Sequence, residues 1–135
     1  MLYLNIQGLR DESGWQAAHI ALPRYDVPTM QTRTLAHPTW IHFGAGNIFR
    51  AFLAAAQQSL LNAGLTDTGI VAAASHNFHA AAESYVPYDN LSLLVRMHAD
   101  GSCDREVIGS VAGCLKADWQ DDDWQTLCRM FCDPS

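Results

Sequence analysis

Residues 39–50 are Thr-Trp-Ile-His-Phe-Gly-Ala-Gly-Asn-Ile-Phe-Arg, and this stretch decides the expected fold. Its first five residues are a short β-prone run, and a glycine turn follows at once, which predicts a strand and then a tight turn. Residues 48–63 are rich in Ala, Leu and Gln with apolar positions at helical spacing. They predict one helix of about four turns, ended by Gly64.

A second strand is predicted at residues 70–74, Ile-Val-Ala-Ala-Ala, which are apolar without alternation, as expected when both faces of a strand are buried. Strand, helix and strand make a βαβ unit. We therefore expect an α/β fold: a Rossmann-like, mostly parallel sheet with flanking helices.

The segments around this unit give weaker signals. Residues 1–38 contain five glycines and prolines that interrupt regular structure, and we expect them to form a lead-in that packs on the domain of residues 39–135. Within the lead-in, a helix is predicted to start at Asp26 with Pro28 in its first turn. Later segments predict a helix over 78–85, two β-prone runs at 91–98 and 105–112 around an Asp-Gly turn, and a helix within 118–132. Trp119 and Trp124 are expected to anchor this last helix to the sheet.

The glycine loop predicts a dinucleotide site. Gly44 permits the tight turn, and Gly46, lacking a Cβ, lets a pyrophosphate approach the backbone. The expected cofactor-binding residues are Gly44, Ala45, Gly46, Asn47, Ile48 and Arg50. The third glycine of the usual fingerprint is replaced by Phe49. Two alternatives stay open, a turn that only reverses the chain and a site for FAD or S-adenosylmethionine.

The residue that would bind the adenosine ribose is not evident. Asp67 has about the expected spacing from the glycines, but it precedes the second strand, on the edge away from the cofactor. The end of that strand carries Ser75, His76 and Asn77, with no carboxylate. The choice between NAD and NADP therefore stays open. Ser110 is a further candidate, expected to border the nicotinamide.

Composition excludes several function classes. The net charge is −6 and the eight Lys and Arg residues are scattered, which argues against nucleic acid and anionic membranes as partners. No apolar run reaches the ~20 residues of a membrane span, and the N-terminus does not resemble a secretory signal, so a cytoplasmic location is expected. The four cysteines are then free thiols. Neither Cys128 with Cys132 nor His76 with His79 has the further ligands of a metal site.

Several stretches resemble the long-chain mannitol dehydrogenase family, which includes mannitol, fructuronate and tagaturonate oxidoreductases. The likeness is carried by four segments: residues 42–50 (His-Phe-Gly-Ala-Gly-Asn-Ile-Phe-Arg), 88–95 (Tyr-Asp-Asn-Leu-Ser-Leu-Leu-Val), 100–112 and 22–27. In this family an asparagine follows Gly-x-Gly and an arginine stands three residues later, in place of a third glycine. Asn47 and Arg50 match that variant.

The resemblance implies metal-independent hydride transfer between NAD or NADP and a polyol or sugar acid. The family's general base is a lysine in a helical C-terminal domain, and Lys116 lies outside that motif, so no catalytic residue is expected in this chain. The chain corresponds to an incomplete nucleotide-binding domain, and we expect it to bind the cofactor without turnover. Missing strands would leave an exposed sheet edge and favour self-association. The rival hypothesis is a non-catalytic nucleotide-binding or interaction module.

Overall fold

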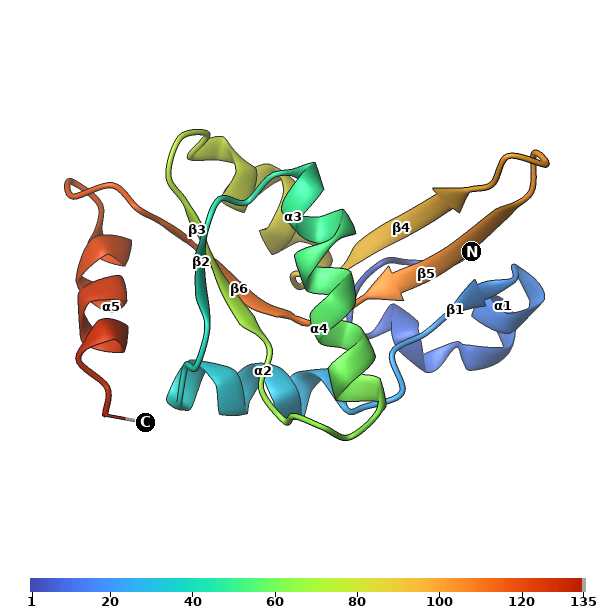
Figure 1. Cartoon of the computed structure of the whole chain (residues 1–135), viewed down its shortest axis with the longest axis horizontal. Coiled ribbons are helices and arrows are strands. Elements are labelled where there is room, and N and C mark those ends of the chain that lie inside the picture. Colours follow the sequence, from blue (N-terminus) through green and yellow to red (C-terminus); the bar gives the residue numbers. More distant parts are fainter. Residues whose placement is uncertain (135) are drawn as a thin grey trace.

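A computed structural model describes residues 1–134 as two small sheets with helices packed around them (Figure 1). One sheet has the order β2-β3-β6 and the other β1-β5-β4. The strands are β1 (Ile20–Ala21), β2 (Ile41–Phe43), β3 (Ile70–Ala74), β4 (Ser92–Met97), β5 (Cys103–Ile108) and β6 (Val111–Lys116). Among the strand pairings of residues 1–134, only β4–β5 is antiparallel, so the predicted α/β fold with a mostly parallel sheet is confirmed.

The β2-β3-β6 sheet is the centre of the molecule. β3 matches the predicted second strand, and its five residues are at most 2% exposed. It pairs in parallel with β2 on one side, from Ile41↔Val71, and with β6 on the other. A strand buried on both faces needs a continuous apolar run, which explains why this segment shows no alternation.

The helix expected over 48–63 is interrupted, so that prediction was wrong in its extent. The structure has α3 (Asn47–Ala51) and α4 (Leu53–Asn62), with Phe52 at φ −111° and ψ −67° between them. Phe49 and Ala54 are both buried, yet a straight helix would place residues five apart about 140° from each other around its axis. The irregular residue between them lets both face the core. Gly64, at φ +70°, ends α4 as predicted.

The segment after β3 also differs from the expected α-helix over 78–85. It contains a π-helical turn, η2 (Ala81–Tyr85), and then a 3-10 turn, η3 (Val86–Tyr88). Asp89 and Asn90 follow with φ of +51° and +65°, a left-handed pair that turns the chain into β4. The Asp89 carboxylate accepts the Ile6 N–H at 2.9 Å, so this turn also holds the lead-in.

The lead-in comprises η1 (Gly8–Arg10), α1 (Glu12–Ala17), β1 and α2 (Val27–Ala36). Asp26 caps α2 as predicted, because its carboxylate accepts the Thr29 N–H at 2.8 Å. β1 pairs in parallel with β5. An apolar cluster forms there from Trp15, Val27, Leu91 and Val107, separate from the main core around β3 and α4.

β4 and β5 form the expected hairpin around Gly101 (φ +87°), but the predicted strand over 105–112 is divided. Its first part belongs to β5 and its second part to β6, in the other sheet (Figure 1). The division falls at Gly109 and Ser110, which are buried and tied to α4: the Gly109 N–H donates to Gln58 and the Ser110 hydroxyl to the Ala54 carbonyl. These bonds turn the chain out of one sheet and into the next.

The last helix, α5 (Asp122–Phe131), is capped by Asp121 and lies beside the parallel sheet (Figure 1). The predicted anchors were wrong. Trp119 is 75% exposed and Trp124 39% exposed, whereas Leu127 is buried. The Phe131 ring stacks on Phe43 of β2, with ring centroids 6.1 Å apart. No helix of residues 1–134 is long and apolar enough to cross a bilayer.

Candidate functional site

The glycine loop leaves the carboxyl end of β2 and enters α3. The Gly44 N–H donates to the Ala73 carbonyl at 2.8 Å, which extends the β2–β3 pairing by one residue. Gly44 then adopts φ +123°, a conformation that L side chains rarely take. The tight turn predicted for this glycine is therefore present at the edge of the sheet where α/β proteins bind ligands.

Gly46 lies open to solvent. A Cβ built on it meets no atom within 4 Å, so its missing side chain leaves free space in front of the backbone. Gly46, Asn47 and Ile48 are all exposed, and no hydrogen bond within residues 1–134 uses their N–H groups. Three consecutive free donors form a surface that an anion can occupy.

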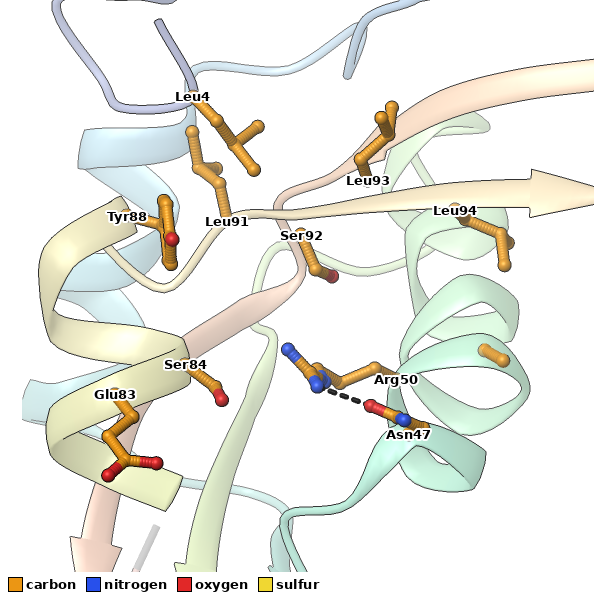
Figure 2. Close-up of a pocket in the computed structure, with 11 residues that line it drawn as sticks. Leu4, Asn47, Arg50, Glu83, Ser84, Tyr88, Leu91, Ser92, Leu93 and Leu94 are labelled. Carbon is orange, nitrogen blue, oxygen red and sulfur yellow. Dashed lines mark hydrogen bonds between the residues drawn. The ribbon is translucent and has the colours of Figure 1, made fainter. Parts of the chain in front are cut away.

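Arg50 supplies positive charge one turn into α3 (Figure 2). Its guanidinium donates to the Asn47 side-chain oxygen and lies 5.4 Å from the centre of the Tyr85 ring. These contacts hold the charged group against the side chain of Asn47, the first residue of α3, and against Tyr85. Arg50 and Asn47 border a cavity of about 370 Å³ between α3, η2 and β4, lined also by Glu83, Ser84 and Ser92.

The end of β3 lies beside the loop. A second cavity, of about 270 Å³, is lined by Gly44–Gly46, by residues 74–77 and by Ala80. The structure thus brings Ser75, His76 and Asn77 to the glycine turn, and none of them carries a carboxylate. Asp67 is not at this edge of the sheet: it forms an ion pair with Arg33 at 3.4 Å.

Phe49 replaces the third fingerprint glycine and is 5% exposed. Its ring stacks on His42 with centroids 4.6 Å apart and planes 8° from parallel. An aromatic pair thus fills the space between strand and helix. His42 is half-buried in this pair.

Ser110 does not border the candidate cofactor site, so that expectation was wrong. It is fully buried just before β6, and its hydroxyl donates to the Ala54 carbonyl at 2.6 Å. This is the amino end of β6, whereas the glycine loop lies at the carboxyl end of the parallel strands. Ser110 is a structural residue that fastens β6 to α4.

One side chain in contact with the glycine loop that the sequence did not reveal is Tyr85. It is 1% exposed, and its hydroxyl donates to the Ala45 carbonyl at 2.9 Å. Burial raises the pKa of this hydroxyl, the nearby Cys114 adds to the rise, and Arg50 opposes it. The only available signal was a tyrosine in the segment between β3 and β4, and the residues around it do not indicate a hydrogen bond to Ala45, 40 positions earlier in the chain.

The described part of the chain contains no group of three His, Cys, Asp or Glu side chains that could hold a metal ion. Lys116 ends β6 and pairs with Asp121 at 3.3 Å. The site therefore consists of backbone donors, one arginine and a polar strand end, a set suited to holding a phosphate-containing ligand.

We compared the sequence of this chain with those of known proteins. No family model matches the chain. D-mannonate oxidoreductase of Thermotoga maritima is 37% identical over 132 residues, which are 98% of this chain and 24% of that protein. This similarity agrees with the resemblance of the chain to the long-chain mannitol dehydrogenase family.

Two solved structures of dehydrogenases share the fold. A D-sorbitol dehydrogenase in substrate-free form superposes with a TM-score of 0.70 and 27% identity, over 87% of this chain and 23% of its own. Pseudomonas fluorescens mannitol 2-dehydrogenase, in a ternary complex with NAD and D-mannitol, gives 0.64 and 26%, over 86% and 22%. The chain therefore spans about a quarter of the length of these relatives.

Proposed function

We propose that this chain is the NAD(P)-binding part of an oxidoreductase that transfers a hydride between a nicotinamide cofactor and a polyol or sugar acid. The observation that carries the proposal is the row of free N–H groups at Gly46, Asn47 and Ile48 at the carboxyl edge of a parallel sheet, with the Arg50 guanidinium bonded to the Asn47 side chain. A pyrophosphate there would accept from the backbone and face the positive charge. NAD is bound in the related mannitol 2-dehydrogenase.

The proposed cofactor residues keep the assignment made from the sequence: Gly44, Ala45, Gly46, Asn47, Ile48 and Arg50. Their roles differ. Gly44 makes the turn, Gly46 leaves room for the pyrophosphate, and Asn47 orients Arg50 through its side-chain oxygen. The cavity at the end of β3 is the proposed place of the adenosine ribose, with Ser75, His76 or Asn77 as hydrogen-bonding partners.

We further propose that residues 39–135 form the nucleotide-binding unit and that residues 1–38 are a lead-in packed on it. Three quarters of the relatives' length has no counterpart in this chain, and the proposed site for the polyol or sugar acid lies there. No described residue is assigned a catalytic role. The four free cysteines, three of them exposed, support a reducing compartment such as the cytoplasm.

Gly46→Ala tests the proposed site directly. The backbone at Gly46, φ −85° and ψ −175°, suits any residue, and the added methyl meets no protein atom within 4 Å. Folding stability is expected to change by less than ~0.5 kcal/mol, as at ordinary surface positions. The dissociation constant for NADH or NADPH, measured by fluorescence titration, is expected to rise by ~10-fold or more, because the methyl occupies the space of the pyrophosphate.

The matched control is Gly113→Ala in β6, where the added methyl meets Leu35 at an ordinary 3.6 Å and lies away from the glycine loop. It should leave the dissociation constant unchanged. Wild-type protein that shows no saturable binding of NADH or NADPH at millimolar concentration would refute the proposal and favour a non-catalytic module. Tighter binding of FAD or S-adenosylmethionine in the same titration would assign a different ligand.

Self-association through a sheet edge is the second part of the proposal. In the part of the chain that the structure describes, β2 has a strand partner on one side only, and Phe43 on it is 48% exposed. Unpaired edges favour association. Sedimentation across a dilution series should show a concentration-dependent dimer, and a monomer at every concentration would contradict this part.

A further inference from the structure

The hydroxyl of Tyr85 forms a hydrogen bond with one peptide unit of the glycine loop. It donates to the Ala45 carbonyl at 2.9 Å from a residue that is 1% exposed. Within residues 1–134, no other side chain forms a hydrogen bond to Gly44, Ala45 or Gly46. Backbone bonds hold the two ends of this part of the loop, from Gly44 N–H to the Ala73 carbonyl and from Arg50 N–H to the Gly46 carbonyl, and Tyr85 provides the side-chain contact between them.

The geometry of the peptide bond links that contact to the direction of the Gly46 N–H. In a trans peptide the carbonyl of one residue and the N–H of the next point in opposite directions, and every peptide within residues 1–134 is trans. Tyr85 draws the Ala45 carbonyl toward the buried side. The Gly46 N–H belongs to the same peptide unit, so it is aimed at the open side.

The ring of Tyr85 has a separate task. The Arg50 guanidinium lies 5.4 Å from its centroid, within the range of a cation–π contact. One side chain thus touches both parts of the proposed anion site, the loop through its hydroxyl and the arginine through its ring. A phenylalanine would keep the ring and remove only the hydroxyl.

Tyr85 is itself held firmly. It ends the π-helical turn η2, and its carbonyl accepts the N–H of Asn90 at 2.9 Å, a residue in the left-handed conformation. Asn90 in turn donates from its side chain to the Ala112 carbonyl of β6. The crossover segment between β3 and β4 therefore fixes the hydroxyl relative to the sheet.

We propose that Tyr85 is a positioning residue for the pyrophosphate of the cofactor, because its hydroxyl turns the Ala45–Gly46 peptide so that the Gly46 N–H faces the ligand. This inference rests on the proposed function. It differs from a purely structural role in one respect: removal of the hydroxyl weakens ligand binding more than the accompanying loss of stability explains.

Tyr85→Phe is compared with Tyr25→Phe. Tyr25 is a matched control, since its hydroxyl also donates one hydrogen bond of 2.9 Å, to Gln58 at the other apolar cluster, and it does not touch the loop. Each variant is titrated with NADH, and each is unfolded in urea. We expect a similar decrease in midpoint for both variants, and a rise of the NADH dissociation constant by ~3- to 10-fold for Tyr85→Phe alone.

Hydrogen exchange of the Gly46 amide provides a second measurement that uses wild-type protein and does not depend on the variant folding. NADH should slow this exchange if the N–H donates to the ligand. The inference is overturned if NADH binds without protecting Gly46, or if Tyr85→Phe binds NADH within twofold of Tyr25→Phe. Absence of NADH and NADPH binding to wild-type protein overturns the proposed function itself, and this inference with it.

Discussion

Replacing Gln58 by methionine removes three hydrogen bonds at once while keeping an unbranched side chain of similar length. Gln58 is 2% exposed on α4. Its amide nitrogen donates to the Val107 carbonyl at 2.7 Å, and its oxygen accepts from the Gly109 N–H at 2.7 Å and the Tyr25 hydroxyl at 2.9 Å. The side chain therefore joins α4 to β5 and to the turn where the chain changes sheets.

The expected cost follows from the groups left behind. Methionine gives no adequate partner to the buried Val107 carbonyl or the Gly109 N–H. A buried polar group that loses its partner costs ~1–3 kcal/mol, so two of them cost ~2–6 kcal/mol. The total stability of a domain is about 5–15 kcal/mol, so the variant should lose a large part of it.

Urea unfolding followed by circular dichroism measures this loss. Gln58→Met should lower the midpoint strongly with little change in the slope, since the surface exposed on unfolding stays similar. Gln57→Met is the neighbouring control: that side chain donates a single bond, to the Thr68 carbonyl, and should cost ~1–3 kcal/mol. A Gln58→Met loss below 1 kcal/mol, or below that of Gln57→Met, would refute the reasoning.

Two further predictions concern ionisation. Burial raises the pKa of Cys114 to about 11. At pH 8 its thiol should therefore react with iodoacetamide far more slowly than the exposed Cys103, Cys128 and Cys132. Equal reaction rates of the four thiols, measured by mass spectrometry, would contradict the burial of Cys114. The hydrogen bonds from Thr29 lower the pKa of Asp26, so the stabilising charge is present above pH 4 and is lost on acidification. Asp26→Asn keeps a cap without titrating, so its melting temperature should fall less between pH 5 and pH 3 than that of wild type, and parallel curves would count against this role.

The sequence was sufficient where the signal is local. β3, the glycine turn and the Asp26 cap follow from short runs whose residue types meet a backbone requirement within a few positions. Gly46 also has the open backbone expected of a glycine before the helix, and its role in binding the cofactor stays a prediction. Such features need no knowledge of the rest of the chain.

Predictions from the sequence failed where the structure depends on contacts between residues far apart in the chain. The break at Phe52 arises because Phe49 and Ala54 must both reach the core, and the division at Gly109 and Ser110 arises from hydrogen bonds to α4. Tyr85 belongs to the same class, since its partner Ala45 lies 40 positions earlier in the chain. Residue types alone carry no record of such pairs.

The parallel pairing of β1 with β5 has a consequence for synthesis of the chain. Ile20 pairs with Arg105, 85 positions later, so β1 and the apolar lead-in residues around it leave the ribosome long before their partner exists. At ~5–20 residues per second the wait is roughly 4–17 s. During that interval Trp15 and its neighbours lack the cover of Leu91 and Val107, so their apolar surface stays open to solvent and to other chains.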